Sequence, residues 1–358
     1  MFCIAAFIIL AILGIFSASH RKLAKKAWHC VWRKITFRPC DISFGEEMKG
    51  KLLGKIIITH PRLAKFLDRW IDVLSFIFVI LTIWSLWTAF MAGLNLWVYD
   101  TCNPVSAESC SLGGEACSLQ VSRLSLIEAV QYRKLGDWIS TSFKDFGETL
   151  SRVPDRFKNW KAEDYFPSTG VYYYQYDPVK PAAVEAIDPS CQFCRKLLTN
   201  IKTAGFDNTH NLVFILYPIP DATKPGGYKF PNSFLMASYI EATKKISLSE
   251  GRGDITPGAW QLLEKLFGTG DGGLWQNQFV NNFDHAAAEK QLQHFLKEIG
   301  YREDQIQAIA QFSTSAEVVD ALKEQADIVV NKLKTVKIPT IVFGGRRYDR
   351  LIDQSQLH

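Results

Sequence analysis

Residues Val184–Lys196 read VEAIDPSCQFCRK, and this stretch decides the fold. An apolar, strand-like run is broken by Pro189, and Cys191 and Cys194 follow at the expected start of a helix that runs to about Lys202. A cysteine in the first turn of a helix faces unsatisfied N–H groups and the positive end of the helix dipole, which favours its thiolate. Cys191 is therefore the predicted nucleophile. Cys194, one turn on, can close a disulfide with it and resolve a mixed disulfide.

Two further features strengthen a redox interpretation of this pair. Glu185 lies six residues before Cys191, where we expect it beneath the cysteines, poorly solvated and able to exchange a proton. Far downstream, Pro339 stands between Ile338 and Thr340 at the entrance to a β-branched run, a position that a central strand does not tolerate. If the Ile338–Pro339 bond is cis, the backbone of Ile338 is available to a passing peptide.

The succession of a strand with an acidic residue, a C-x-x-C helix, a long helical segment and an Ile-Pro pair before a strand resembles the thioredoxin superfamily. The closest likeness is to its DsbA-like branch of extracytoplasmic thiol-disulfide oxidoreductases. The resemblance covers about residues 171 to 358 and implies an α/β thioredoxin-like fold with a large helical insertion. It also implies that Cys191 attacks and Cys194 resolves, with Glu185 as the buried acidic residue. Pro339 would be the cis-proline.

By the same likeness, a substrate peptide docks beside Pro339 and pairs with the backbone near Ile338, and the hydroxyl of Thr340 lies close by. The dipeptide Gln192-Phe193 matches none of the pairs familiar in that family, so oxidase, reductase and isomerase stay open. A second departure is the short chain of about nine residues after Asp349, where a closing helix is expected.

Two apolar segments precede this domain. Phe2–Ala18 contains no charged residue and, with Met1 and Ser19, is just long enough to cross a bilayer. A cleaved signal peptide is the rival interpretation, but no basic residue precedes the run and only a weak small-x-small site follows, so we expect an anchor. Val73–Val98 is uncharged for 26 residues and has aromatic residues at both ends, which is typical of a spanning helix.

The charge distribution predicts the orientation. The stretch Arg21–Arg69 carries thirteen Lys and Arg against four acidic residues, whereas Asp100–Gly136 carries three basic residues. By the positive-inside rule the basic loop is cytoplasmic, and the N-terminus and everything after Tyr99 are extracytoplasmic. The formal net charge of +5 mostly reflects this topology, and no nucleic-acid partner is expected.

Cysteine usage agrees with that topology, because disulfides persist outside the cytoplasm. Cys102, Cys110 and Cys117 directly follow the second apolar segment, with turn-forming residues between them, and we expect one disulfide among the three. Two interpretations of the cluster stand: it is a structural staple at the membrane surface, or its remaining thiol relays electrons to Cys191 or pairs with Cys3. In the basic loop, Cys30 and Cys40 are expected to be reduced structural thiols.

The rest of the chain supplies a connector and the insertion. Apolar residues at three- and four-residue steps between Leu135 and Trp160 predict an amphipathic helix, split or kinked at Pro154. It either lies in the membrane interface or packs on the domain. About four helices are expected between Asn232 and Lys334, followed by a hairpin whose primed turn is Gly344-Gly345.

Residues 1–19 and 73–99 are therefore predicted as transmembrane helices, 20–72 as the cytoplasmic loop and 100–165 as the connector. Residues 166–358 are predicted as the thioredoxin-like domain, with its insertion at about 221–335. The predicted function is a two-pass, membrane-embedded thiol-disulfide oxidoreductase that acts on protein or peptide thiols and disulfides, together with a membrane redox partner. A tethered binding or chaperone module is the alternative. Neither a cofactor nor a metal is expected, because His210, His285 and His294 lack ligand spacing.

Overall fold

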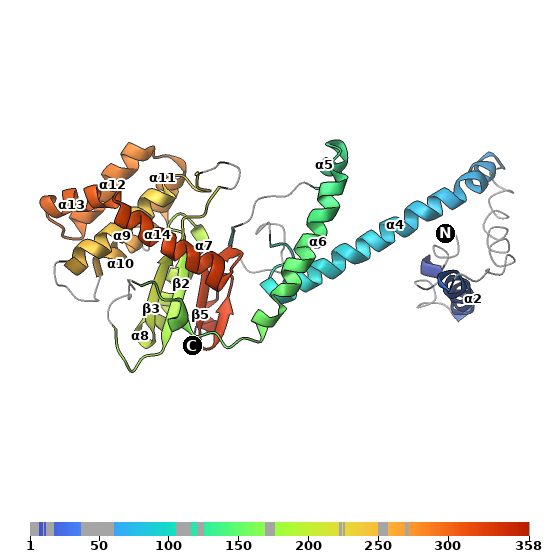
Figure 1. The fold of residues 1–358 in the computed structure, drawn as a ribbon, viewed down its shortest axis with the longest axis horizontal. Coiled ribbons are helices and arrows are strands. Elements are labelled where there is room, and N and C mark those ends of the chain that lie inside the picture. The colour runs from blue at the N-terminus through green and yellow to red at the C-terminus, as the bar shows by residue number, and fades with distance from the viewer. Residues whose placement is uncertain are drawn as a thin grey trace. The chain divides into compact units, whose positions relative to one another are not determined.

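The computed structural model describes residues 7–9, 11, 18–36, 61–104, 116–119, 125–168, 176–221, 224, 226–249, 257–268 and 272–357. The chain divides into two compact units, Met1–Met91 and Ala92–His358. The first contains helix α2 (Ala18–Ile35) and the greater part of helix α4 (Pro61–Tyr99) (Figure 1). The predicted thiol site lies wholly in the second unit.

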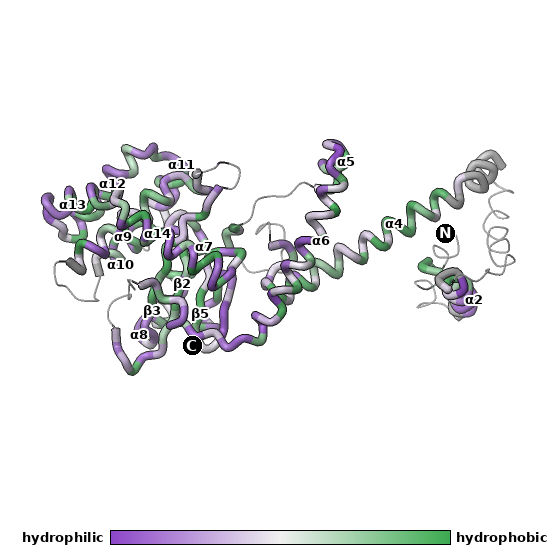
Figure 2. Tube along the Cα trace, viewed as in Figure 1, coloured by the Kyte–Doolittle hydropathy of each residue, from purple (hydrophilic) through white to green (hydrophobic). Residues whose placement is uncertain are grey.

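Helix α4 contains the predicted second span. Within the described residues, Val73–Tyr99 is the segment long and apolar enough to cross a membrane, and its hydrophobic character is visible along the helix in Figure 2. The helix begins upstream of the predicted span at Pro61, where a proline costs no intrahelical hydrogen bond. The first predicted span, residues 1–19, falls largely outside the described residues, as does much of the basic loop.

The second unit is built on a four-stranded sheet in the order β3-β2-β5-β6. Strands β2 (Ala182–Ile187) and β3 (Asn211–Leu216) are parallel, and helix α7 (Gln192–Ala204) connects them. Strand β5 (Thr340–Phe343) runs antiparallel to β2, and β6 (Arg346–Tyr348) runs antiparallel to β5. This is the predicted thioredoxin-like arrangement, with β2 and its Glu185 in the interior of the sheet.

The local chemistry of the chain explains these elements. Every residue of β3 is buried, in keeping with the continuous apolar run Leu212–Leu216. Helix α7 buries Leu197, Leu198 and Ile201 on one face and ends at Gly205, whose φ of 68° suits a glycine at a helix C-terminus. The predicted hairpin is confirmed, because Gly344 and Gly345 both have positive φ and Phe343 pairs with Arg346.

Between β3 and β5 the chain forms the helical insertion, which gathers at one end of the sheet (Figure 1). Its helices are α9 (Ser233–Ser249), α10 (Pro257–Phe267), α11 (Leu274–Asn281), α12 (His285–Glu298), α13 (Glu303–Ser313) and α14 (Ala316–Asp327), and a π-helical turn follows at Ile328–Leu333. Helix α9 packs against α10, α12, α13 and α14, and α14 contacts β3. The sequence predicted about four of these helices and missed α11.

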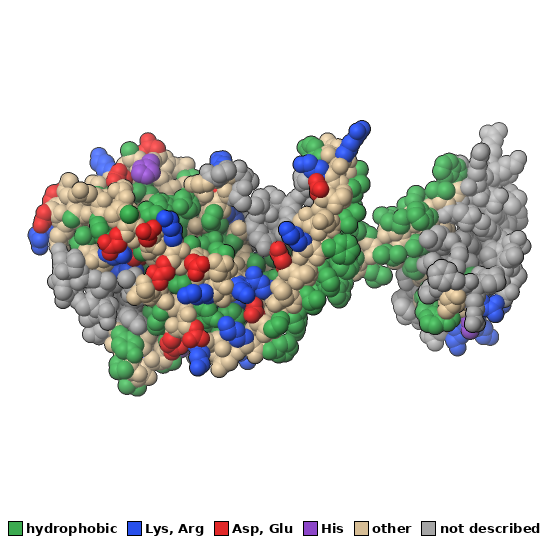
Figure 3. All heavy atoms as spheres, in the orientation of Figure 1, with side chains coloured by type: hydrophobic (Ala, Val, Ile, Leu, Met, Phe, Trp, Pro, Cys, Tyr) green, Lys and Arg blue, Asp and Glu red, His purple; other side chains and the backbone are tan. Residues whose placement is uncertain are grey.

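The connector forms α5 (Leu126–Gln131) and α6 (Leu135–Ser151), and a 3-10 turn at Val153–Arg156 follows around Pro154. The predicted apolar stripe is largely exposed, with Phe143 at 63% and Phe157 at 78% of full exposure. Figure 3 shows hydrophobic side chains gathered along α6. The expected closing helix is a single 3-10 turn at Gln354–Gln356, and most of the predicted strand at 171–176 lies outside the described residues.

Candidate thiol-disulfide site

Cys191 occupies the N-cap of α7 and so stands at the start of the helix. Its backbone N–H donates to the carbonyl oxygen of Asp188 at 2.9 Å, and its own carbonyl accepts from the N–H of Cys194 at 3.1 Å. The side chain therefore projects from the end of the helix that carries unpaired N–H groups and partial positive charge. This position stabilises a thiolate whenever the Cys191 sulfur is not bonded to another sulfur.

A buried carboxylate ties the turn before Cys191 to the rest of the domain. Asp188 accepts from the N–H of Ser190 at 2.8 Å and the hydroxyl of Ser233 at 2.6 Å through one oxygen. Its other oxygen accepts from the N–H of Ile219 at 2.8 Å. Burial raises the pKa of Asp188 to about 6, and these three hydrogen bonds oppose the rise. The carboxylate thus joins the nucleophile's turn to the segment after β3 and to the first helix of the insertion.

Helix α11 completes the support of this turn. The buried side chain of Gln276 donates from Nε2 to the carbonyl oxygens of Pro189 at 2.9 Å and Cys191 at 3.1 Å. Arg195, one residue beyond the C-x-x-C motif, donates to the carbonyl of Gly272 at 2.7 Å. The insertion therefore serves the site directly, because its helices hold the nucleophile's backbone in place.

The second cysteine of the motif is a buried free thiol. Burial raises the pKa of Cys194 well above its ordinary value, and the nearby charges of Glu185 and Asp188 raise it further. Glu185 is itself only 1% exposed, and burial raises its pKa to about 8. Its Oε1 has no hydrogen-bond partner among the described residues. The predicted position of Glu185, poorly solvated and close to the cysteine pair, agrees with this geometry.

Cys191 is bonded to Cys117, with an S–S distance of 2.04 Å, and not to Cys194. Of the three candidates for a disulfide within the cluster, Cys102, Cys110 and Cys117, it is Cys117 that is bonded to a cysteine outside the cluster. Cys102 is disulfide-bonded as well, and Cys110 lies outside the described residues. Cys30, expected to be a free thiol, is also disulfide-bonded, which corrects that expectation. The disulfide brings Cys117 to Cys191, whereas a relay of electrons between them stays a prediction.

A short strand pair brings the two sulfurs together. Strand β1 (Cys117–Ser118) runs antiparallel to β4 (Lys337–Ile338), with Cys117 opposite Ile338 and Ser118 opposite Lys337. The Ile338–Pro339 bond is cis, the condition on which the predicted peptide site depended. The carbonyl oxygen of Ile338 lies 3.7 Å from the Sγ of Cys191. Cys191 and the Ile338–Pro339 pair, which are far apart in sequence, therefore lie together in the fold.

Hydroxyl and carboxylate groups hold the chain before and after Pro339. The Oγ1 of Thr340 donates to the carbonyl of Lys337 at 2.7 Å and lies 2.7 Å from the Oγ1 of Thr335. Thr335 donates to Asp349 at 3.0 Å, and Asp349 pairs with Arg347 at 2.9 Å. The hydroxyl of Thr340, expected beside the substrate, is thus engaged in positioning β4.

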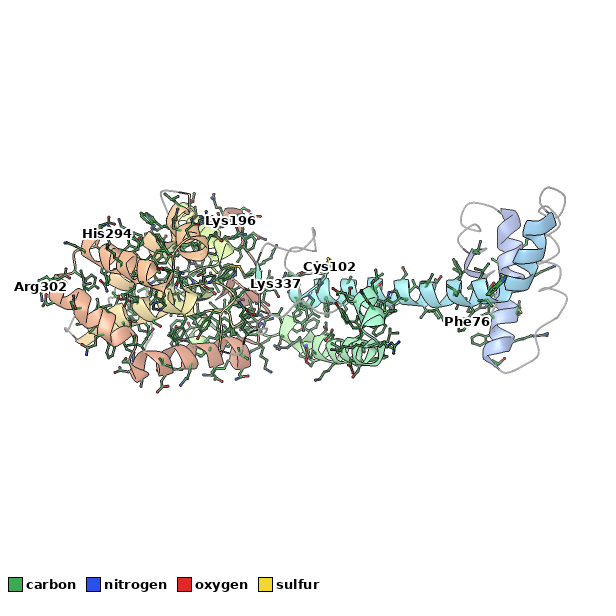
Figure 4. All side chains as sticks on the ribbon, turned by 90° about the horizontal axis from the view of Figure 1, so that it is seen from above. Phe76, Cys102, Lys196, His294, Arg302 and Lys337 are labelled. Atoms are coloured by element: carbon green, nitrogen blue, oxygen red, sulfur yellow. A yellow bond between two sulfur atoms is a disulfide. The ribbon has the colours of Figure 1, made fainter. Side chains whose placement is uncertain are left out.

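Lys337 is a buried cation that sequence reasoning missed. Its side chain is fully buried and its Nζ has no hydrogen-bond partner among the described residues. Burial lowers its pKa to about 8, and the charges of Asp349 and Asp100 oppose the fall. In Figure 4, Lys337 lies at the side of the domain that meets the connector carrying Cys102, away from the outer helices that carry His294 and Arg302.

Asp188, Gln276 and Lys337 are the members of the site that the sequence did not indicate. Asp188 immediately precedes the proline of the motif, and a short polar residue before a proline was the one available signal for it. Gln276 and Lys337 become neighbours of the cysteines only through the packing of distant elements. Among the described residues, no group of three His, Cys, Asp or Glu side chains is placed to hold a metal ion.

No protein-family model and no curated protein matches this sequence. Solved structures similar to the chain include a thioredoxin-like oxidoreductase from Silicibacter pomeroyi, at 16% identity and a TM-score of 0.35 over 53% of this chain and 88% of that one. The thiol-disulfide exchange protein alpha-DsbA2 from Wolbachia pipientis has 16% identity and a TM-score of 0.37 over 55% and 87%. The thiol-disulfide oxidoreductase MdbA from Corynebacterium diphtheriae has 13% identity and a TM-score of 0.38 over 55% and 99%.

The buried carboxyl of Glu185 makes a testable contribution to stability. An unfolded Glu ionises near pH 4.5, whereas Glu185 in the fold ionises near pH 8, so between these values the folded state holds a proton that the unfolded state has released. This contribution is complete below pH 4.5 and is lost as the pH rises through 8. The loss is about 1.4 kcal/mol per pH unit.

Urea unfolding of the full chain in detergent, followed by circular dichroism from pH 4 to 9, measures this slope. We expect Glu185→Gln to remove most of it, while the slope below pH 6 that comes from Asp188 remains in both proteins. Equal slopes for the wild type and the variant above pH 6 would show that Glu185 is ionised in the folded state.

Proposed function

We propose that this protein is a membrane-anchored thiol-disulfide oxidoreductase that exchanges disulfides with protein or peptide substrates through Cys191 and Cys194. The observation that carries the proposal is the Cys117–Cys191 disulfide beside Ile338, in which an extended segment is paired with β4 while its cysteine is bonded to Cys191. An external peptide bound in the same way presents its own sulfur to Cys191.

The chemistry follows from the environment of each sulfur. As a thiolate, Cys191 is stabilised by the start of α7 and attacks a disulfide sulfur of the substrate, so that a mixed disulfide forms and the substrate's other sulfur leaves as a thiolate. Cys194 then attacks the Sγ of Cys191, and the bound substrate sulfur leaves. Oxidation of a substrate runs through the same mixed disulfide in reverse.

Cys194 needs help to lose its proton, because burial and nearby negative charge favour its thiol. Glu185, in its ionised form, is the proposed acceptor, since its carboxyl is close enough to influence Cys194 and a pKa of about 8 leaves a fraction of it ionised near neutral pH. When the mixed disulfide forms in the opposite direction, the same carboxyl returns the proton. Its role is thus proton transfer at Cys194, and not contact with the substrate.

The direction of exchange depends on how strongly the reduced Cys191 thiolate is stabilised relative to the disulfide. The start of α7 favours the thiolate and therefore favours donation of the disulfide to a substrate. A membrane redox partner that resets the cysteines belongs to this proposal. The alternative is a tethered binding or chaperone module, which binds peptides beside Ile338 and Pro339 without disulfide exchange. It predicts a Cys191 thiol of ordinary pKa that reacts slowly.

The proposed membrane arrangement places residues 1–19 and 73–99 in the bilayer and residues 20–72 in the cytoplasm. The connector at 100–165 and the thioredoxin-like domain at 166–358 are then extracytoplasmic. It is supported by the apolar helix Val73–Tyr99 and by the excess of basic residues before it. The disulfides at Cys102 and Cys117 agree with an oxidising compartment for the second unit, whereas the disulfide at Cys30 counts against the cytoplasmic assignment of residues 20–72.

Turnover of a disulfide substrate tests the proposed activity. We expect the full chain in detergent to catalyse the reduction of insulin by dithiothreitol, Cys191→Ser to fall to the uncatalysed rate, and Cys194→Ser to lose at least tenfold because release of the mixed disulfide then depends on the external thiol. Thr199→Ala, on the exposed side of α7, is the matched control and keeps the wild-type rate. A fully active Cys191→Ser protein would refute the proposal.

Protease accessibility in oriented vesicles tests the topology. Trypsin added to right-side-out vesicles is expected to degrade the region after Tyr99 and to spare the basic loop Arg21–Arg69, because that loop is enclosed. In inverted vesicles the loop is cut and the thiol domain is protected. Cleavage of both regions from the same side would contradict the two-pass arrangement.

A further inference from the structure

The Cys117 segment, defined here as Ala116–Leu119, is held against β4 by more than its disulfide. The backbone N–H of Leu119 donates to the carbonyl of Val336 at 3.0 Å, which continues the pairing of β1 with β4. Lys229 donates to the carbonyl of Ser118 at 3.1 Å, and the hydroxyl of Ser118 donates to the carbonyl of Pro104 at 3.0 Å. Ala116, Cys117 and Ser118 are buried. The segment is thus bound as an extended peptide, by main-chain hydrogen bonds and a buried sulfur.

The disulfide of this segment has an unusual neighbour. Cys194, a free thiol, lies one helical turn from Cys191 and is buried in the same core. A thiol so placed beside a disulfide is positioned to exchange with it. The oxidised chain therefore has two pairings at one oxidation level: Cys117 with Cys191, or Cys191 with Cys194.

We propose that the Cys117 segment is a built-in occupant of the peptide site, and that Cys117 is a third redox-active cysteine which Cys194 releases from Cys191. The inference rests on the proposed function and specifies how its site is regulated. With the segment bound, the peptide site is filled and the sulfur of Cys191 is bonded to that of Cys117. With the segment released, the site is open and Cys191 carries the disulfide that substrates exchange with.

The exchange balances without an added oxidant. The Cys194 thiolate attacks the Sγ of Cys191, the Cys191–Cys194 bond forms and the Cys117–Cys191 bond breaks. The electron pair of the broken bond leaves with Cys117 as a thiolate. The proton lost by Cys194 passes to Glu185 and is replaced, at the end, by the proton that Cys117 takes up. One disulfide and one thiol are present before and after the step.

The burial of Lys337 raises the free energy of the state in which the Cys117 segment occupies the peptide site. Ser118 lies directly opposite Lys337 across the strand pair, so the segment contributes to the burial of that ammonium group. A buried cation without a hydrogen-bond partner is unfavourable, and exposure on release of the segment relieves it. This cost opposes the backbone pairing and so favours release of the segment.

The bound segment also defines the peptide class that competes with it. Such a peptide is extended, carries a small residue before its cysteine as Ala116 does, and leaves the next carbonyl free for Lys229. Because the built-in segment is tethered, an external peptide must reach an effective concentration on the order of millimolar to match it.

Disulfide mapping of the unreduced full chain tests the pairing. Chymotrypsin cuts after Phe193, which separates Cys191 from Cys194, and a glutamyl endopeptidase cuts after Glu115, which separates Cys117 from Cys110. We expect a Cys117–Cys191 peptide from the wild type and from Cys194→Ala, and a Cys191–Cys194 peptide from Cys117→Ser. Cys117 linked to Cys102 or Cys110 in the wild type would overturn the proposal.

Oxidation of a reduced peptide copying residues 115–120 by the unreduced chain tests the competition, because the thiol of the peptide can exchange with the disulfide of the chain. At micromolar peptide, we expect Cys117→Ser to react about tenfold faster than the wild type, because its site is not already filled. Leu119→Pro keeps every cysteine but removes the N–H that binds Val336, and we expect an intermediate rate. Ser125→Ala, which alters only the cap of α5, is the matched control and reacts as the wild type does.

The two proposals fail in different ways. Equal, measurable rates for the wild type, Cys117→Ser and Leu119→Pro would refute the built-in occupant and leave the exchange activity intact. No turnover by Cys117→Ser, in a chain whose Cys191–Cys194 disulfide is shown by mapping, would refute the exchange activity itself.

Discussion

The pairing of β1 with β4 is the interaction on which the site depends. It places a cysteine from the connector against the residue before Pro339, and so brings the Cys117 sulfur to Cys191 across 74 positions of sequence. Strand β4 can accept a partner because it lies outside the four-stranded sheet, where its main-chain groups are not used by another strand of that sheet. A strand edge of this kind binds extended peptides through main-chain hydrogen bonds, which do not depend on most of the peptide's side chains.

The surroundings of the two motif cysteines give them different tasks. Cys191 stands at the start of α7, held there by Asp188 and Gln276, and only its sulfur is left for chemistry. Cys194 and Glu185 are buried, and a negative charge on Glu185 raises the cost of one on Cys194. In the proposed mechanism a proton passes between these two groups. The core thus keeps Cys194 unreactive toward solvent while leaving it able to attack the neighbouring sulfur.

The sequence predicted those elements whose signals come from residues close together in the chain. The βαβ unit, the C-x-x-C helix and the hairpin at Gly344-Gly345 each have a local chemical signature in turn formers, helix-end positions or apolar periodicity. The resemblance to the thioredoxin superfamily rests on Cys191, Cys194, Glu185 and Pro339. It predicted that the C-x-x-C helix and the strand after Pro339 belong to one domain. Helix α11 was missed because its eight residues follow a glycine-rich stretch and carry no clear periodicity.

Long-range pairings had no such signature. Nothing in the spacing of Cys102, Cys110 and Cys117 distinguishes a disulfide within the cluster from one to Cys191, because disulfide connectivity depends on the fold of the intervening chain. Lys337 reads as an ordinary basic residue before a strand, and only the packing of β1 across β4 makes it a buried cation. The site is therefore predictable as a motif, but its occupant is visible only in three dimensions.

The proposed function requires Cys191 to be an activated nucleophile, and the pKa of its thiol measures that activation. The fully reduced chain is alkylated with iodoacetamide across a range of pH, and the two motif cysteines are resolved by mass spectrometry after chymotryptic cleavage at Phe193. The account predicts that Cys191 reacts with a midpoint well below the ordinary thiol value of about 8.5, while Cys194 stays unreactive. A midpoint at or above that value, or faster alkylation of Cys194 than of Cys191, would contradict it.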